Sequence, residues 1–166
     1  MDETTFGKRF SKELEAEAKA SRRCLERVPE SLFDWKPHEK SMKMGYLALL
    51  VAEIPKWITT MVNETELDFG KYEHFEPATT DALVKHFDEN FEEAKKALRN
   101  LSDNELGETF ALKNNGQTVV EGTKLSMLEP VINHLVHHRG QLTVFMRLKD
   151  IEVPSIYGPS ADDRSF

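Results

Sequence analysis

The chain has 166 residues, of which 39% are hydrophobic and 31% are charged, and its formal net charge is −7 at pH 7. This length is typical of one domain, and this composition excludes a disordered chain because enough apolar surface is available to build a core. The negative charge, with no block of lysine and arginine, argues against a nucleic-acid partner, since phosphate binding needs a positive face.

The N-terminal residues 1–10 lack the apolar core of a signal peptide. No stretch of the sequence approaches the roughly 20 apolar residues of a membrane-spanning helix. The single cysteine, Cys24, excludes an internal disulfide, which agrees with a reducing compartment. We therefore expect a soluble cytoplasmic protein with no membrane partner.

Four segments show the helical period, in which apolar or small residues recur at steps of three and four. They lie at about residues 3–28, 41–64, 80–101 and 126–148. Ser41 and Thr80 precede the second and third segments as predicted N-caps. Ser126 starts the fourth, where Glu129 completes an S-x-x-E capping box.

The connections between these segments are long. Residues 66–79 read as a loop, and FALKNNGQTVV predicts a small hairpin around Asn115 and Gly116. Residues 149–166 contain two prolines and a glycine and are expected to form an extended tail over the helices. Together the pattern predicts an all-α fold. One domain over residues 1–166 would form a four-helix bundle with a hairpin or loop insertion between the third and fourth helices.

The fourth segment differs from the others because polar side chains occupy the face that should be buried. His134, His138 and Gln141 follow one another there, and an unpaired buried polar group costs roughly 1–3 kcal/mol. His134 and His138 are one helical turn apart, the spacing with which a helix offers two imidazoles to one metal ion. Alternatively, the pair bonds to itself, to Gln141 or to buried water. Arg139 lies off this face and is expected to form an ion pair or to anchor the tail.

The stretch NHLVHHRGQLTVFMRL, followed by VPSIYGPSADD, resembles the DinB superfamily of DinB- and YfiT-like metalloenzymes. The stretch SMKMGYLALLVAEIPKW resembles the second-helix region of that family. The resemblance implies a four-helix bundle, often a homodimer, in which three histidines bind nickel or zinc. Two of them correspond to His134 and His138. Relatives include thiol-dependent S-transferases, which implies a low-molecular-weight thiol as cofactor and a small-molecule ligand. The family name records induction by DNA damage.

The chain departs from this pattern at Leu50, where the family has its third histidine. A leucine cannot bind metal, and catalytic zinc usually has three protein ligands, so the set is incomplete. Glu53, one turn further on, is a candidate third ligand. Leu50, Trp57, Gln141 and Tyr157 are expected to line a pocket at the histidines. Two functions remain open: a metal-dependent hydrolase or thiol transferase, or a non-catalytic binding or stress-response scaffold that has lost the metal.

Two further histidines are weaker candidates for the missing ligand. His74 lies in the loop before the third helix, and His86 lies within that helix. His86 is adjacent to the buried position Phe87, so we expect it at the surface or at a helix boundary.

Overall fold

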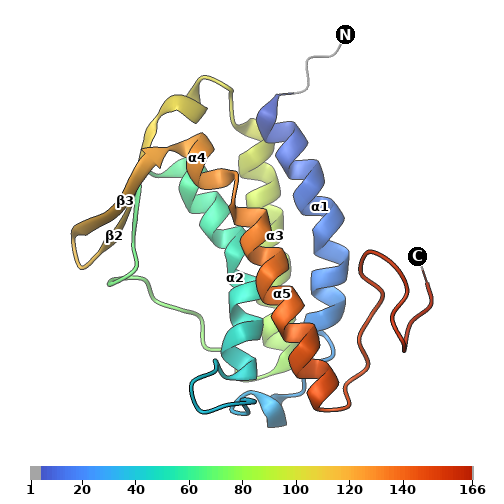
Figure 1. Cartoon of the computed structure of the whole chain (residues 1–166). Helices are drawn as coiled ribbons and strands as arrows, with labels where there is room; N and C mark the ends of the chain where they lie inside the picture. Colours follow the sequence, from blue (N-terminus) through green and yellow to red (C-terminus); the bar gives the residue numbers. More distant parts are fainter. Residues whose placement is uncertain (1–4, 166) are drawn as a thin grey trace.

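The computed structural model describes residues 5–165. Its four long helices are α1 (Phe6–Leu25), α2 (Met44–Asn63), α3 (Thr80–Asn100) and α5 (Val131–Leu148). The helices pack in a ring in which α3 contacts α1 and α2, and α5 contacts α2 and α1 (Figure 1). This arrangement confirms the predicted four-helix bundle.

The chain direction explains the long connection after α2. The helices α2 and α3 lie side by side and run in the same direction, whereas α1 and α5 run the opposite way (Figure 1). Since a helix of 20 residues is about 30 Å long, the chain must return along α2 before α3 can begin. The segment 69–79, here called the crossover segment, makes this return.

The all-α prediction is wrong in one respect, because the structure also contains a three-stranded sheet in the order β1-β2-β3. It consists of β1 (Glu66–Asp68), β2 (Thr109–Asn114) and β3 (Gln117–Thr123). The predicted hairpin is β2–β3, and Asn115 and Gly116 have φ of 51° and 82°, as a type I′ turn requires. The addition is β1, which pairs with β2 in parallel. The Asp68 carboxylate accepts from both turn amides, at 2.8 Å each.

The predicted fourth helix over residues 126–148 is two helices, α4 (Lys124–Leu128) and α5. Pro130 has no N–H to continue the helical ladder, so α4 ends before it and α5 begins after it. Glu129 is therefore the C-cap of α4 and not part of a capping box. The N-cap of α4 is Thr123, which accepts from the backbone N–H of Ser126.

The other predicted caps are also displaced. Thr79 caps α3 through its hydroxyl, whereas the Thr80 hydroxyl donates to the Val28 carbonyl and so connects α3 to the loop that follows α1. Ser41 caps nothing, since the first amides of α2 donate to the carbonyls of Trp35 and Phe33. Backbone carbonyls of the preceding loop therefore accept the hydrogen bonds that a cap side chain would otherwise accept.

Two of the helices, α1 and α2, are shorter than predicted. The first helix ends at Leu25 and not at residue 28, because Arg27 and Val28 bond three residues back and Pro29 disfavours a helical residue before it. Residues 3–4 of its predicted start lie outside the described residues. The second helix starts at Met44 and not at residue 41.

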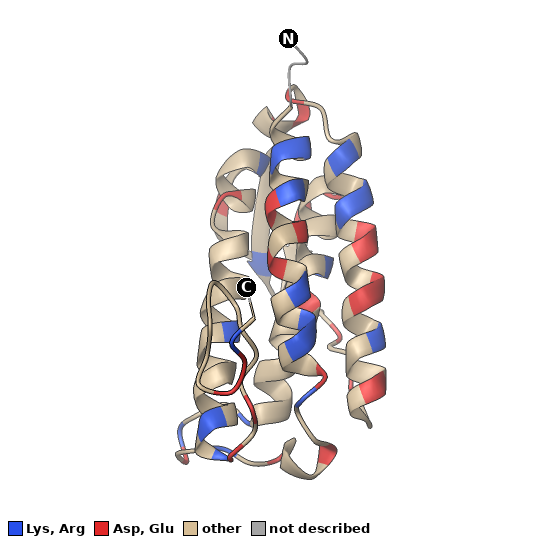
Figure 2. Ribbon diagram, turned by 90° about the vertical axis from the view of Figure 1, so that its right-hand side faces the viewer, with Lys and Arg blue, Asp and Glu red and all other residues tan. Residues whose placement is uncertain are grey.

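The core forms where the four apolar faces meet. Its buried side chains include Leu14, Leu47, Ile54, Phe87 and Leu142, each at most 1% exposed. Charged residues of both signs alternate along the outer sides of α1 and α3, whereas α5 carries few (Figure 2). Among residues 5–165, no helix has the length and apolar character needed to cross a membrane.

The C-terminal segment lies against α1 and α5, as predicted (Figures 1 and 2). Arg23 of α1 contacts Asp163 at 2.5 Å, and Arg147 of α5 contacts Asp162 at 2.5 Å. Asp163 also accepts from the amides of Ser155 and Ser165. The acidic end of the tail is therefore held by arginines from two helices.

Candidate functional site

The helix α5 brings the rings of His134 and His138 together, with their Nε2 atoms 2.8 Å apart. His138 is buried, at 8% exposed, whereas His134 is exposed. The expectation that both lie on the buried face is therefore right for His138 and wrong for His134. The pair lies at the margin where α5 meets α2, with one ring inside and one facing outward.

Hydrogen bonds set the proton positions in this pair. His138 Nδ1–H donates to Gln141 Oε1 at 2.8 Å, so His138 Nε2 carries a lone pair when the ring is neutral. That atom accepts from His134 Nε2–H. His134 Nδ1 is then left as an acceptor without a hydrogen-bond partner among the described residues. The chain of three side chains therefore ends in an open proton acceptor.

The pKa of His134 is lowered from its ordinary value. Partial burial contributes most, and the nearby rings of His138 and His137 add to the effect. His134 is consequently neutral at neutral pH, which keeps its Nδ1 atom available as an acceptor.

Two of the predicted pocket residues come from α2. Trp57 is 7% exposed, and the centre of its ring is 5.6 Å from the ring of His134. Leu50, two turns earlier in α2, is 6% exposed within the apolar core. The structure therefore brings Trp57 to the histidine pair and packs Leu50 as an ordinary core side chain.

The carboxylate of Glu53 belongs to a different group of residues. It is fully buried, and it accepts from His74 Nδ1 at 2.6 Å and from the Phe75 amide at 2.9 Å. His86 Nε2 lies 3.4 Å from its second oxygen without the geometry of a hydrogen bond. Glu53 is thus already paired with the crossover segment and with α3. His86, expected at the surface or a boundary, has a side chain only 14% exposed.

The donor set does not fit the three-ligand metal centre that the resemblance implies. His134 and His138 supply two converging nitrogens, Leu50 supplies none, and the Glu53 carboxylate is engaged elsewhere. Across residues 5–165, no group of three or more histidine, cysteine, aspartate or glutamate side chains has an arrangement that could hold a metal ion. We therefore derive no chemistry through a metal.

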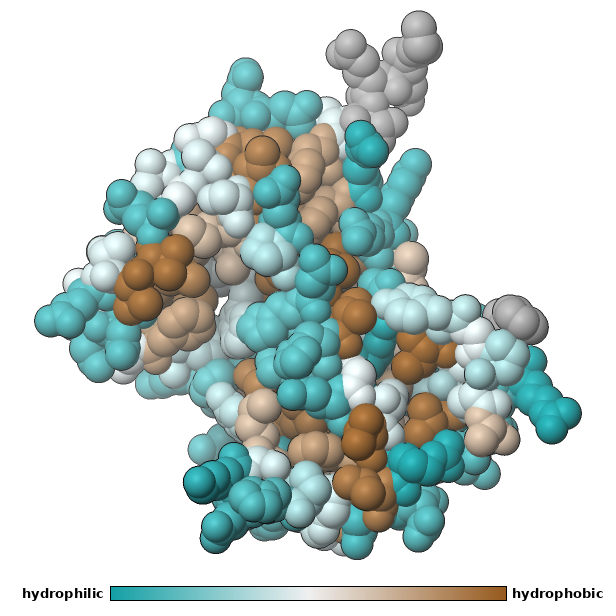
Figure 3. All heavy atoms as spheres, viewed as in Figure 1, coloured by the Kyte–Doolittle hydropathy of each residue, from teal (hydrophilic) through white to brown (hydrophobic). Residues whose placement is uncertain are grey.

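Two buried polar atoms between the histidine pair and the Glu53 group lack hydrogen-bond partners within the described part of the chain. Trp57 Nε1 and the Tyr72 hydroxyl are buried and make no hydrogen bond of normal geometry to a described residue. Burial and the Glu53 charge raise the pKa of Tyr72 to about 12, so its hydroxyl stays protonated. The surface is hollowed in front of α2, between the β2–β3 hairpin and α5 (Figure 3). This side of α2 is therefore concave (Figure 3).

Tyr157, also predicted for the pocket, lies elsewhere. Its hydroxyl bonds to Arg139 and Glu17, and its side chain is largely exposed. Arg139 is 1% exposed and pairs with Glu17 at 2.6 Å, while donating to the Ser21 hydroxyl. Arg139 thus forms the predicted ion pair and holds the tail through Tyr157.

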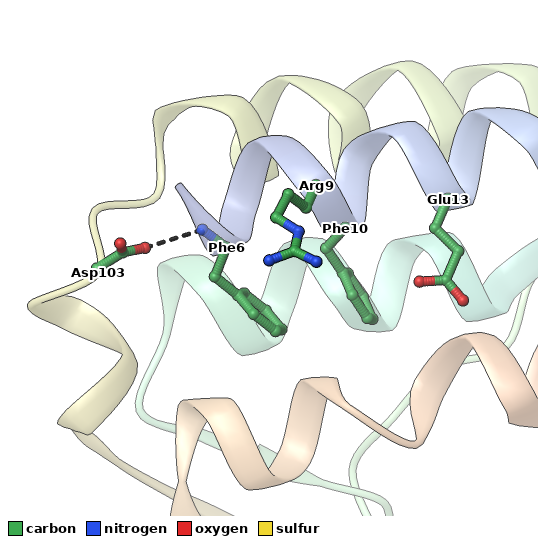
Figure 4. A pocket seen from close by; sticks show the side chains of 5 residues that line it. All are labelled: Phe6, Arg9, Phe10, Glu13 and Asp103. Carbon is green, nitrogen blue, oxygen red and sulfur yellow. Dashed lines mark hydrogen bonds between the residues drawn. The ribbon is translucent and has the colours of Figure 1, made fainter. Parts of the chain in front are cut away.

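Other features offer less chemistry. A surface hollow near the start of α1 is lined by Phe6, Arg9, Phe10, Glu13 and Asp103, with the two phenyl rings stacked at 5.2 Å (Figure 4). None of these groups ordinarily titrates near neutral pH. Cys24 is fully buried, and burial raises the pKa of its thiol to about 11, so it is not a reactive thiolate.

The main group that the sequence did not indicate is the one around Glu53. His74 is 21 residues from Glu53 along the chain, and no local spacing connects them. One signal was present: a glutamate on an apolar helix must find partners, because an unpaired buried charge is costly. The direction of those partners depends on the path of the crossover segment.

Comparisons with known proteins extend along the whole chain. A family model described as DinB family matches residues 1–164. The uncharacterized protein YrdA of Bacillus subtilis (strain 168) is 27% identical over 157 residues, which cover 93% of this chain and 89% of that protein.

Solved structures give the same fold. A DinB-like protein from Bacillus cereus ATCC 10987 superposes with a TM-score of 0.68 at 19% identity, covering 93% of this chain and 99% of that one. The DinB-like protein YjoA from Bacillus subtilis gives a TM-score of 0.66 at 19% identity, covering 94% and 99%.

Proposed function

Because the chain belongs to the DinB family, as the match over residues 1–164 shows, we propose that it uses the family's histidine position without the three-ligand metal centre. In this proposal it binds a small molecule with an acidic hydrogen, of the class of low-molecular-weight thiols, at His134. The observation that carries the proposal is the chain Gln141–His138–His134, which ends in an open Nδ1 acceptor.

The proposed chemistry is a proton transfer. A thiol bound on the α2 side donates its S–H to His134 Nδ1, and the proton moves to that nitrogen as a thiolate forms. His138 then accepts more strongly from the charged ring, and Gln141 holds His138 in the required tautomer. Since the thiolate is the reactive form of a thiol, such a site would serve thiol transfer. The same site without a second substrate would be a thiol-binding scaffold.

The first experiment tests whether the protein binds a metal ion. Elemental analysis of purified protein should find no stoichiometric nickel, zinc or manganese. Leu50→His should gain one bound zinc or nickel ion, because a third imidazole would complete the ligand set. Tight stoichiometric metal in the unsubstituted protein would instead favour the metal-dependent hydrolase or transferase.

The second experiment tests the ligand. Trp35→Phe leaves Trp57 as the only indole, since the chain has two tryptophans, and its fluorescence then reports on the histidine pair. Cysteine or glutathione should give a saturable change and ultraviolet absorbance of the thiolate, whereas S-methylcysteine, which has no S–H, should give neither.

His134→Leu should abolish both signals, while His137→Gln, at the exposed neighbouring position, should keep them. Equal responses to cysteine and S-methylcysteine would contradict the proposed role of the acidic hydrogen.

A further inference from the structure

The crossover segment carries a histidine that the proposed function does not use. His74 Nδ1 lies 2.6 Å from Glu53 Oε2, and the carboxylate is fully buried inside α2. The other carboxylate oxygen accepts from the Phe75 amide at 2.9 Å. Two bonds therefore fix the carboxylate, and the carboxylate in turn fixes the imidazole.

This geometry sets the tautomer of His74. An ionised carboxylate only accepts hydrogen bonds, so His74 Nδ1 carries the proton and Nε2 carries the lone pair. His74 is an exposed residue whose side chain is 35% exposed, and its hydrogen bond to Glu53 uses Nδ1 and leaves Nε2 unengaged. The free base of the ring therefore faces solvent, while its protonated side faces the buried charge.

We propose that Glu53 and His74 form a carboxylate–imidazole pair in which His74 is a general base, a catalytic residue, and Glu53 is its positioning residue. A buried carboxylate on Nδ1 orients an imidazole and stabilises the imidazolium that forms when Nε2 accepts a proton. The inference is independent of the function proposed for His134, because it uses neither that ring nor a thiol.

The surroundings of His74 indicate the class of substrate. The rings of Tyr46 and Tyr72 stand edge-on to the imidazole, with centres 5.6 and 4.9 Å away. Tyr46 is 42% exposed, so an accessible aromatic ring borders the exposed imidazole and can pack against an apolar or aromatic group. The pair would therefore act on small esters that carry an aromatic or apolar group.

The step balances with water as the only co-reactant. The oxygen of a water molecule attacks the ester carbonyl carbon, and the proton of that water moves to His74 Nε2. The C–O bond breaks, and the leaving oxygen keeps its electron pair and takes the proton from the imidazolium, which gives the free acid and the alcohol or phenol and restores neutral His74.

A purely structural role must be distinguished from this one, because the same two bonds also hold the crossover segment on α2. His74→Asn separates the two roles. The Asn side-chain amide can donate to Glu53 as Nδ1–H does, but it has no basic nitrogen. The matched control is His38→Asn, since His38 Nδ1 accepts from the Lys40 amide and has no carboxylate partner.

The assay is hydrolysis of p-nitrophenyl acetate by the full chain, with thermal unfolding as the check that each variant is folded. His74→Asn should lower the rate about 100-fold, the lower end of what a positioned base contributes, and His38→Asn should leave it unchanged. Glu53→Gln should move the pH profile of the rate to lower pH, because the imidazolium loses its stabilising charge.

A rate in His74→Asn equal to that of the parent protein would overturn the inference. An unchanged pH profile in folded Glu53→Gln would overturn the role of Glu53. If Glu53→Gln does not fold, His74→Asn decides the matter by itself.

Discussion

Arg139 offers a sharp test of how the C-terminal motif is built, because its guanidinium is buried in the bundle. Its side chain is 1% exposed, and its closest partner, Glu17, is 13% exposed. Replacing it by methionine keeps an apolar chain of similar length but removes the charge. Glu17 keeps its bond from the Tyr157 hydroxyl at 3.0 Å, and Ser21 keeps its bond to the Glu17 carbonyl at 3.0 Å. What remains unbalanced is the charge of Glu17.

The magnitude follows from that remaining charge. Breaking a buried ion pair by removing one partner costs about 3–5 kcal/mol, against about 5–15 kcal/mol for the whole free energy of unfolding. Arg139→Met should therefore lose a large part of the stability. The double variant Glu17→Met with Arg139→Met should lie within about 1 kcal/mol of the parent, because no uncompensated charge remains.

The assay is urea unfolding followed by circular dichroism at neutral pH, with the slope against urea checked for constancy. Arg27→Met is the control, since Arg27 bonds only to the exposed Glu152 carbonyl and should change the free energy by no more than about 0.5 kcal/mol. The reasoning is refuted if Arg139→Met stays within about 1 kcal/mol of the parent, or if the double variant is as unstable as the single one.

Three further outcomes are expected. The lowered pKa of His134 means that the unfolded chain takes up a proton that the folded chain resists. The free energy of unfolding should therefore fall as pH drops below about 6.5, and His134→Gln should reduce this slope in urea titrations at a series of pH values; equal slopes would contradict it. Hydrogen bonds from Ser165 and Ser155 hold the pKa of Asp163 well below its usual range. Asp163→Asn should speed amide hydrogen exchange in residues 149–165, and unchanged protection would disprove the anchoring role. Thr79→Ala should cost about 1 kcal/mol in urea unfolding because it removes the cap of α3, and no loss would show that the cap contributes nothing.

The close spacing of polar residues in one motif can mislead about its function. The run from His134 to Gln141 reads as a single site, yet its members separate in the structure. His134, His138 and Gln141 bond to one another, whereas Arg139 turns toward α1 and holds Tyr157. Side chains of adjacent residues on a helix point about 100° apart, so neighbouring residues of the motif contact different parts of the protein.

The sequence alone determined the features that depend on nearby residues. The period of apolar residues placed four helices, since only a helix brings positions three and four apart onto one face. The Asn115–Gly116 turn was also readable, because these two residues tolerate the positive φ that the turn requires. Leu50 was correctly placed on a buried face for the same periodic reason.

Tertiary structure decided the rest. The three residues of β1 carry no local signal and form a strand only because β2 lies beside them. Glu53 meets His74 and His86 because the parallel course of α2 and α3 brings the crossover segment back along α2. Local preferences extend over a few residues, whereas these contacts depend on the path of the whole chain. The partners of a buried charge are therefore decided only when the helices have packed.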